Sequence, residues 1–235
     1  TYEDDCKCFE MSPDGKYFYI GGTSRDSIVM FETKVPYYMT DGAITEAVSR
    51  GTFCLGYNQH NSFIGRIDEV GDNDDYVRGL EFNGDGTKLY LVGYGNDTIQ
   101  QFSLSTPYKI GEIHDNSIYD GAYDVGADGF TTPYSMKWNN DGTKFFLVDR
   151  TSTVDSVIEY SVSNAYDVTT GTITEGTNFS VQSYETMPND VAFNADGTKM
   201  FVIGETSDKI HEWTLSTGFD LSSTVTYVSA TSLGM

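Results

Sequence analysis

The sequence has few positive charges, no long apolar run and no helical periodicity. It contains 14 lysine and arginine residues against 35 aspartate and glutamate residues, so its formal net charge is −21. This balance excludes nucleic acid and anionic membranes as expected partners, because phosphate binding needs a basic surface. No stretch of about 18 apolar residues occurs, so we expect no membrane-spanning helix. Without apolar residues at helical spacing, the sequence favours an all-β fold.

Short catalytic motifs are absent as well. The sequence contains no GxSxG nucleophile motif, no HExxH motif, no P-loop and no dinucleotide-binding fingerprint. Its three histidines, His60, His114 and His211, show no recurring spacing that would bring several imidazoles together for metal binding or catalysis. From these absences we expect a protein that is not an enzyme and has no cofactor other than a calcium ion, which is considered below.

Cysteine occurs only at Cys6, Cys8 and Cys54. A disulfide between Cys54 and either of the other two is compatible with this count, whereas Cys6 and Cys8 lie too close on one strand face for an easy bridge. The cysteines therefore do not identify a redox compartment. The sequence begins at Thr1 without a signal peptide, so we expect a processed chain or an ordered part of a longer polypeptide.

The sequence does contain one short motif that recurs four times. The copies read "MSPDGKYFYIG" from Met11, "FNGDGTKLYLVG" from Phe82, "WNNDGTKFFLVD" from Trp138 and "FNADGTKMFVIG" from Phe193. The steps between their Asp-Gly pairs, at residues 14, 85, 141 and 196, are 71, 56 and 55 residues. A period of this size indicates a propeller or a solenoid.

Further positions recur in the same register. Aligned lysines follow the turn in all four copies: Lys16, Lys88, Lys144 and Lys199. The apolar run after them ends in Gly21, Gly93, Asp149 and Gly204. Aspartates then open the next strand: Asp26, Asp97, Asp155 and Asp208. Aromatic residues follow the turn glycine by 22 to 24 positions: Tyr37, Tyr108, Tyr166 and Phe219. Because the aspartates of the turn and of the next strand recur once per unit, we interpret them as turn residues rather than as a catalytic cluster.

The apolar runs decide the predicted architecture. They do not alternate with polar residues, so both faces of their sheets must be dry, as in four-stranded sheets stacked face to face. The Asp-Gly pair predicts a tight hairpin between the first two strands of each unit. We therefore predict an all-β chain, a β-propeller of four four-stranded antiparallel blades, as a closed four-bladed ring or as part of a larger propeller or array. The single domain, 1–235, would hold blades at about 5–55, 76–125, 132–182 and 187–231, with an insertion at 56–75.

The repeat resembles a known group. "DGTKLYLVG" and "DGTKMFVIG" are similar to the YVTN-type β-propeller repeat, and "YDVTT" (166–170) and "FDLSS" (219–223) extend the resemblance. Similar repeats occur in bacterial and archaeal surface proteins and in virion proteins of marine phages. The resemblance implies an extracellular structural or recognition module, such as a virion, fibre or cell-surface component that mediates assembly or adhesion. We take this non-enzymatic role as the first prediction.

The alternative implied by the same resemblance is a metal-dependent, lactonase-like propeller hydrolase. Such enzymes hold a metal through glutamate, asparagine and aspartate side chains at the top of the central channel. The first-strand residues expected nearest the axis do not make such a set: Cys8, Gly79, Ser135 and Asp190.

Non-repeating loops are where repeat scaffolds usually bind partners. The insertion has the polar and aromatic mixture of a contact loop, and we predict its binding residues to be Tyr57, Asn58, His60 and Phe63. Its partners would be proteins, including identical copies in an assembly, or carbohydrate. Deleting the insertion should leave the fold intact but abolish assembly or adhesion.

Two acidic stretches, residues 68–75 and 119–129, place many oxygen atoms close together, as calcium requires. The metal candidates in the first stretch are Asp72, Asp74 and Asp75, although neither stretch matches the twelve-residue calcium loop. Two sequons give candidate glycosylation sites at Asn96 and Asn178.

Overall fold

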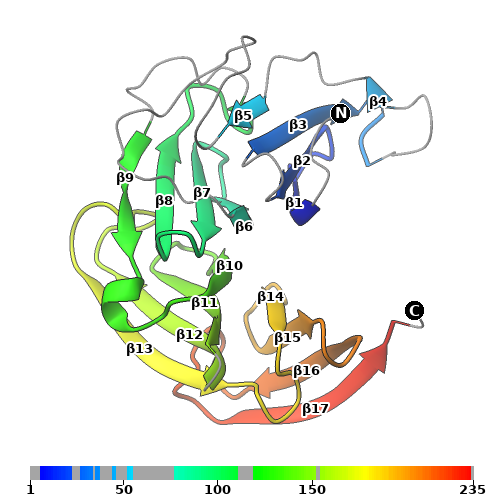
Figure 1. Cartoon of the computed structure of the whole chain (residues 1–235), viewed down its shortest axis with the longest axis vertical. Helices are drawn as coiled ribbons and strands as arrows, with labels where there is room; N and C mark the ends of the chain where they lie inside the picture. The colour runs from blue at the N-terminus through cyan, green and yellow to red at the C-terminus, as the bar shows by residue number, and fades with distance from the viewer. Residues whose placement is uncertain are drawn as a thin grey trace. The chain divides into compact units, whose positions relative to one another are not determined.

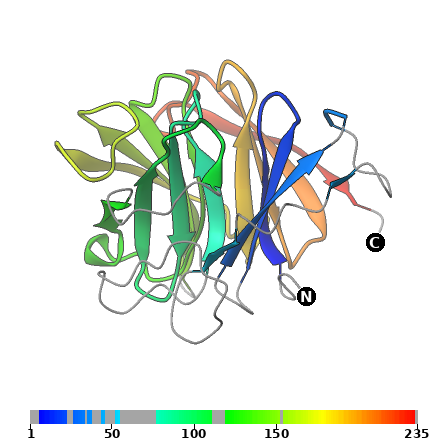
Figure 2. The same ribbon diagram turned by 90° about the horizontal axis from the view of Figure 1, so that it is seen from above.

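The structure is a computed structural model that describes residues 6–22, 27–33, 35–37, 44–45, 52–54, 77–110, 119–151 and 154–233. The chain is all-β, as predicted: its strands form four antiparallel sheets, each built from strands that follow one another in sequence (Figure 1). Each sheet is a blade of the β-propeller type, and in each the Asp-Gly hairpin joins the first two strands (Figure 2). Within these ranges no helix is long and apolar enough to cross a membrane.

The chain divides into two compact units, residues 1–123 and 124–235, each described by itself. In unit 1, blade 1 contains β1 (Cys6–Met11), β2 (Tyr17–Gly22), β3 (Ser27–Thr33), β4 (Ile44–Thr45) and β5 (Thr52–Cys54). The two short strands β4 and β5 both pair with β3. Blade 2 contains β6 (Val77–Phe82), β7 (Lys88–Gly93), β8 (Thr98–Ser103) and β9 (Tyr119–Asp124).

Unit 2 has the same organisation. Blade 3 contains β10 (Pro133–Trp138), β11 (Lys144–Thr151), β12 (Val154–Val162) and β13 (Ile173–Ser180), preceded by the 3-10 helix η3 (Gly126–Asp128). Blade 4 contains β14 (Pro188–Phe193), β15 (Lys199–Gly204), β16 (Lys209–Leu215) and β17 (Val225–Ser232). The register of the first strand shifts by one residue at equivalent places in all four blades, which are next to Cys8, Gly79, Ser135 and Asp190.

The Asp-Gly turn has the same hydrogen bonds in blades 2, 3 and 4 and a variant of them in blade 1. In blade 3 the Asp141 carboxylate accepts from the backbone N–H and the hydroxyl of Thr143, at 3.0 and 2.6 Å. The Asn139 side chain accepts from Lys144 N at 3.1 Å. Similar bonds surround the equivalent aspartates, which are Asp14, Asp85 and Asp196. The predicted structural role of these aspartates is therefore confirmed.

The recurring aromatic residue closes over this turn. Tyr166, with a φ of 56°, donates its N–H to the Gly142 carbonyl at 2.9 Å, and its hydroxyl donates to the Asn140 carbonyl at 2.7 Å. A Cβ on Gly142 would overlap the Tyr166 ring, and Gly142 has a φ of 70°. Glycine is thus required there both for space and for backbone conformation. The same N–H to glycine bond is made by Tyr37, Tyr108 and Phe219.

The lysine alignment is wrong by one residue in blade 1. Tyr17 N donates to Ser12 Oγ at 2.9 Å, the bond that the aligned lysine makes to asparagine in the other blades. Lys16 therefore takes the place of the threonine, which the first repeat lacks. The glycine that ends the apolar run in register with the other blades is Gly22 rather than Gly21.

The predicted strand-opening aspartates differ among the blades. Asp97 and Asp208 are turn residues with φ values of 54° and 52°, as expected. Asp155 is not: it lies within β12, where it pairs with Arg150 across the ladder and is 5% exposed. The reason is that β11 and β12, with eight and nine residues, extend beyond their equivalents in the other blades. Asp26 lies outside the described residues.

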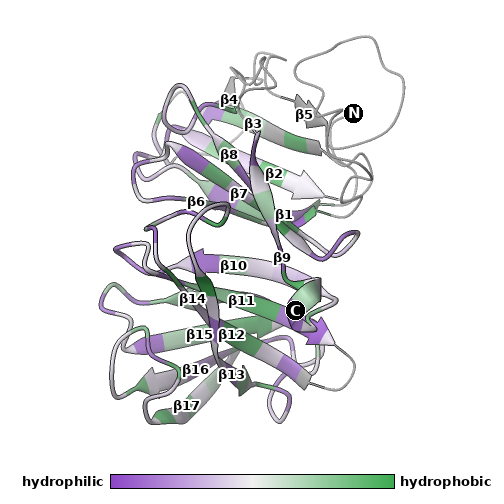
Figure 3. Ribbon diagram, turned by 90° about the vertical axis from the view of Figure 1, so that its left-hand side faces the viewer, coloured by the Kyte–Doolittle hydropathy of each residue, from purple (hydrophilic) through white to green (hydrophobic). Residues whose placement is uncertain are grey.

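Both faces of the apolar run are dry in two of the blades. Residues 89–92 and 145–148 are all buried, and β11 is green where they lie in Figure 3. In blade 4 only alternate residues of 200–203 are buried, and in blade 1 residues 17 and 20 are half-buried. The prediction of dry tracts is therefore confirmed for blades 2 and 3 and only in part for blades 1 and 4.

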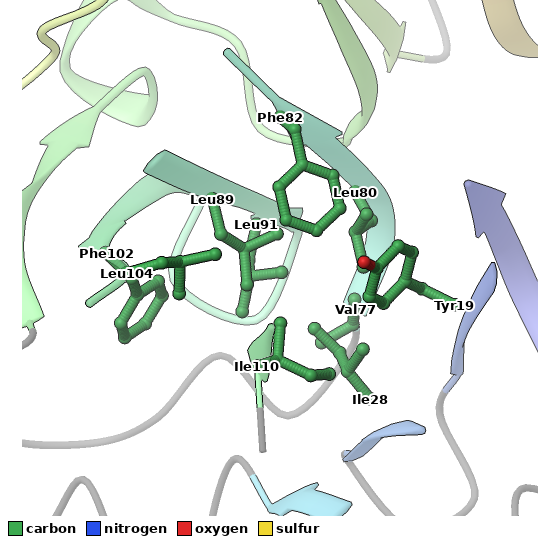
Figure 4. Close-up of a cluster of buried hydrophobic side chains, with 10 residues drawn as sticks. All are labelled: Tyr19, Ile28, Val77, Leu80, Phe82, Leu89, Leu91, Phe102, Leu104 and Ile110. Atoms are coloured by element: carbon green, nitrogen blue, oxygen red, sulfur yellow. The ribbon is translucent and has the colours of Figure 1, made fainter. Parts of the chain in front are cut away.

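The blades pack face to face within each unit. We call the face of blade 1 that carries Tyr19, and the equivalent face of every blade, the forward face; the opposite face is the rear face. Tyr19 and Ile28 of the blade 1 forward face join a buried cluster with the rear face of blade 2 (Figure 4). In unit 2, Phe146 and Val148 of the blade 3 forward face pack in the same way with the rear face of blade 4, which carries Trp213.

The turn predicts an asymmetry between two glycines that both have positive φ. Gly142→Ala should lower the free energy of unfolding by about 2–5 kcal/mol, because it adds overlap with the Tyr166 ring to the strain of a left-handed alanine. Gly129→Ala is the matched control: its φ is 97°, but nothing lies within 4 Å of the new Cβ. It should cost only about 1–2 kcal/mol. Urea denaturation measures both, and equal losses would contradict the role of the ring.

Candidate functional site

Arg150 is the centre of a polar group at the ends of β10, β11, β14 and β15. Its guanidinium lies over the Tyr134 ring, 4.2 Å from the ring centre. Its Nη1 donates to Asn189 Oδ1 at 2.7 Å and forms an ion pair with Glu205 Oε1 at 3.3 Å. The Arg150 side chain is 6% exposed, whereas that of Glu205 is 56% exposed. The group therefore fixes a nearly buried arginine and presents a carboxylate to solvent. We call these four residues the Arg150 group.

The repeat explains why these residues meet. Arg150 and Glu205 occupy equivalent positions just after the apolar runs of blades 3 and 4, and Tyr134 and Asn189 occupy equivalent positions on the first strands. Backbone bonds join the two strand ends in each blade, from Arg150 N to Thr132 O and from Glu205 N to the corresponding carbonyl, both at 3.0 Å. Asn189 Nδ2 also donates to Glu205 Oε1 at 3.3 Å.

Unit 1 has a related pair at the same positions with the residue types exchanged. Arg78 stands on the first strand of blade 2 and Tyr94 follows the second strand, whereas in blade 3 the tyrosine comes first. The Arg78 guanidinium lies 4.9 Å from the Tyr94 ring centre, and its Nη2 donates to the Tyr94 hydroxyl at 3.2 Å. Each unit thus has an arginine stacked on a tyrosine at this end of its described strands.

In each blade of unit 2, a buried carboxylate accepts hydrogen bonds from two backbone N–H groups near the strand ends that carry the Arg150 group. In blade 3, Asp149 accepts from Thr132 N at 2.9 Å and from Thr151 N at 3.0 Å. In blade 4 the equivalent two N–H groups donate to Glu185, which comes from the loop before β14. Gly204 replaces the aspartate there, and a Cβ on it would overlap the Glu185 side chain. The glycine that ends this run is therefore needed to admit a carboxylate from another loop.

The protein shifts the pKa values of these two carboxyl groups in opposite directions. Burial raises the pKa of Asp149, and the backbone hydrogen bonds from Thr132 and Thr151 only partly offset it. Burial acts on Glu185 in the same sense, but hydrogen bonds from Ser207 and from backbone N–H groups outweigh it and lower the pKa of Glu185. The extra hydrogen bonds of Glu185 thus favour its ionised form.

Asp155 is the third buried carboxyl near Arg150. Burial raises the pKa of Asp155, and the neighbouring Arg150 charge acts against this rise. Arg150 therefore has acidic groups on both sides, in the interior and at the exposed Glu205. Together they offset part of the positive charge of Arg150.

The structure also brings Ser207, His211 and Glu185 together, a combination that the sequence spacing did not indicate. Ser207 Oγ lies 2.9 Å from His211 Nε2 and 2.6 Å from Glu185 Oε2. A carboxylate only accepts, so the serine hydrogen goes to Glu185 and the histidine Nε2–H must donate to the serine. The nitrogen facing Ser207 therefore has no lone pair with which to act as its base. His211 and Glu185 are 3% and 1% exposed, and burial lowers the pKa of His211, so this network is structural.

The predicted binding and metal residues are not tested by the structure. Tyr57, Asn58, His60 and Phe63 lie outside the described residues, and so do Asp72, Asp74 and Asp75. The insertion as a contact loop and the calcium site therefore stay predictions. Asn96 lies in the exposed turn before β8, and Asn178 is exposed on β13, and their glycosylation stays a prediction as well.

The second acidic stretch is largely bonded within the protein. Asp120 Oδ2 accepts from Gln101 and Ser103, Asp124 from Ala127 N, and Asp128 from the Tyr160 hydroxyl. Over the described ranges, no group of three or more histidine, cysteine, aspartate or glutamate side chains is arranged to hold a metal ion.

Neither the protein families nor the curated proteins compared give a match to this sequence. Solved structures do match. A candidate 6-phosphogluconolactonase from Bacteroides fragilis has a TM-score of 0.60 at 17% identity, over 97% of this chain and 55% of its own. The Pseudomonas aeruginosa periplasmic gluconolactonase has a TM-score of 0.53 at 16% identity, over 96% of this chain and 53% of its own. The β-propeller domain of Cps50 from Myceliophteria thermophila has a TM-score of 0.54 at 10% identity, over 98% of this chain and 62% of its own.

These likenesses show a β-propeller fold, while the YVTN-type repeat stays a resemblance. The chain spans about half the length of the lactonase structures that it matches. The expectation of a protein that is not an enzyme is contradicted, because the matching structures include proteins described as lactonases. Nothing in the comparison supports the expected virion, fibre, cell-surface or adhesion role.

Glu185 gives a prediction about pH and stability. Glu185→Gln should lower the free energy of unfolding by about 2–3 kcal/mol near neutral pH. Both carboxylate oxygens of Glu185 accept hydrogen bonds, whereas the side-chain amide of glutamine has only one oxygen that can accept. Because folding lowers the pKa of Glu185, its contribution is present above the unfolded pKa and is lost as the pH falls through the folded value. The difference from the parent chain should therefore shrink from about pH 7 to about pH 3. Glu175→Gln, at an exposed site on β13, is the control, and a constant difference across the range would contradict the assignment.

Proposed function

We propose that this chain is part of a β-propeller hydrolase that opens a sugar-acid lactone, with the Arg150 group as its substrate-facing site. The likeness to proteins described as lactonases supports the reaction class. The observation that carries the site is the exposed Glu205 carboxylate, held beside a nearly buried Arg150 by an ion pair at 3.3 Å. Sites of propellers and other repeat folds commonly lie on residues that break the repeat, and Arg150 and Glu205 differ in type at equivalent positions.

The reaction needs a base for water and a positive charge near the carbonyl oxygen. Water adds to the lactone carbonyl carbon and one of its protons passes to Glu205. The ring C–O bond then breaks, and Glu205 returns that proton to the leaving ring oxygen, which gives the open hydroxy acid. Arg150 is a positioning residue: with Asn189 it fixes the Glu205 carboxylate. Its permanent charge also favours the oxyanion that forms in the transition state.

The charge of the site favours a neutral lactone over a phosphorylated one. Arg150 is already paired with Glu205, so the Arg150 group has no surplus positive charge. The whole chain carries a formal net charge of −21, which would repel a phosphate ester. A phosphate is usually held by several arginine, lysine or backbone N–H donors, which the Arg150 group does not supply.

The metal dependence implied by the lactonase alternative does not fit the residues that the structure describes. Ser135 is 5% exposed, and Asp190 Oδ1 accepts from Val191 N at 2.9 Å. With no carboxylate and imidazole cluster among the described residues, no step is assigned to a metal ion.

The proposal predicts hydrolysis of glucono-δ-lactone by the chain of residues 1–235, above the spontaneous rate. Acid release at constant pH measures it, and the 6-phosphate of the same lactone should react more slowly. A rate equal to the background for both compounds would overturn the proposal, and a faster reaction of the phosphate would overturn the assigned substrate class.

The roles within the Arg150 group predict different kinetic effects. Glu205→Gln should lower kcat by about 100-fold or more, the usual contribution of a general base. Arg150→Lys keeps the charge but loses the Nη1 nitrogen that contacts both Asn189 and Glu205, so kcat should fall less and KM should stay the same. Glu175→Gln, exposed on β13, should leave both constants unchanged. An unaltered kcat in Glu205→Gln would exclude it as the base.

A further inference from the structure

The forward face of blade 3 is completely covered by blade 4. Its residues Phe146, Val148 and Val157 are all 0% exposed. Phe146 touches two rings of the blade 4 rear face, with ring centres 4.4 Å from Phe193 and 6.2 Å from Phe219. We use this contact as the reference for how one blade of this chain packs against the next.

An ion pair of blade 3 also forms hydrogen bonds to blade 4 in the same contact. Lys144 Nζ forms an ion pair with Glu159 Oε1 at 2.6 Å and donates to the Phe219 carbonyl at 3.0 Å. Glu159 Oε2 accepts from Leu221 N at 2.7 Å. The lysine and glutamate of one blade thus bind the backbone around the turn aromatic of the following blade.

Unit 1 has a related contact without the charged pair. Tyr19 of the blade 1 forward face lies 4.8 Å from Phe82, which lies 5.3 Å from the turn aromatic Tyr108. The Tyr19 hydroxyl, rather than a lysine, donates to the Tyr108 carbonyl. In both units the forward face therefore binds the carbonyl of the next blade's turn aromatic.

Blade 4 has equivalent residues on its own forward face, but they are only partly covered. Phe201 and Ile203 stand where Phe146 and Val148 stand in blade 3, and both are half-buried. Ile210, equivalent to the fully buried Val157, is 36% exposed.

The charged pair is repeated there too. Lys199 and Glu212 occupy the positions of Lys144 and Glu159. Lys199 Nζ and Glu212 Oε1 form an ion pair at 2.8 Å, and their side chains are 47% and 23% exposed. Blade 4 therefore carries a complete docking surface: Phe201, Ile203, Ile210, Lys199 and Glu212.

Blade 1 has the matching surface on its rear face. Phe9 is 54% exposed, whereas its equivalents on the other rear faces, Leu80, Met136 and Val191, are 1% to 5% exposed. The turn aromatic Tyr37 is 62% exposed. Met11 stands at the position of Phe193, next to it on the same rear face.

We propose that the forward face of blade 4 binds the rear face of blade 1 of a second copy of this chain. Phe201 then contacts Met11 and Tyr37 of the second copy, and Lys199 donates to the Tyr37 carbonyl. Every copy carries both surfaces, one at each end of its series of blades, so the contact joins unlike faces head to tail. The contact already exists twice within each copy, between blades 1 and 2 and between blades 3 and 4, each time with an aromatic residue on the forward face and a hydrogen bond to the carbonyl of the next blade's turn aromatic.

Two single substitutions test the proposal by sedimentation. Ile210→Asp blocks the forward face of blade 4, and Phe9→Asp blocks the rear face of blade 1. The unaltered chain should self-associate with rising concentration, at about 0.15 M salt to screen the acidic charge. Each variant alone should remain monomeric, and a one-to-one mixture should form dimers and nothing larger, since one intact pair of faces remains.

The mixture separates the proposal from its alternatives. If the unaltered chain stays monomeric, the proposal is overturned. This holds whether the faces are then covered by blades of the same chain or by a further polypeptide segment. Association that persists in both variants, or a mixture that forms no dimer, overturns it as well. Met187→Asp, 41% exposed and on neither face, is the matched control and should associate like the parent chain.

The charged pair gives a second, independent test. Lys199→Met should weaken the association about tenfold or more, because Glu212 then loses its partner within the contact. Lys209→Met, exposed on the rear face of blade 4, removes the same charge elsewhere and should have no effect. Equal effects of the two variants would overturn the role of Lys199.

Discussion

A sheet that is apolar on both faces is stable only where another sheet covers each face, and this requirement shapes the entire chain. It explains why the sequence repeats, because the surface that fits such a sheet best is a copy of itself. It also explains where the burial is incomplete. Tyr19 and Phe146 are fully buried on forward faces that a following blade covers, while Phe201 at the same position in blade 4 is only half-buried.

The Asp-Gly turn contributes a second, local constraint that links sequence positions far apart. The turn glycine needs a left-handed φ, and it also makes room for an aromatic ring that arrives 22 to 24 residues later. That aromatic residue then offers its backbone carbonyl to the preceding blade, as Tyr108 does to Tyr19 and Phe219 does to Lys144. One small motif therefore shapes the hairpin, closes the blade and marks the contact between neighbours.

The repeated features were predictable from the sequence because each appears four times in one register. The strands of blade 4, the Asp-Gly hairpins and the recurring positions of the turn aromatics all follow from that regularity, whereas the contact of each ring with its turn came from the structure. Features that occur once were not predictable. The Glu185 carboxylate takes over the role of Asp149 from a different loop, and Gly204 gives no hint of this because glycine is the usual residue at that position. The placement of Asp155 within a strand depends on two extra ladder positions, which no residue type signals.

The same distinction accounts for the candidate site. Residues that repeat are used for packing, so the chemistry must come from positions where the blades differ, and these have no pattern to reveal them. Arg150 and Glu205 are equivalent by position but opposite in charge, and the packing of blades 3 and 4 brings them to 3.3 Å. An ion pair of this kind cannot form between identical repeats, since both positions would carry the same charge. Divergence at one position of an otherwise regular scaffold is therefore enough to create a polar site.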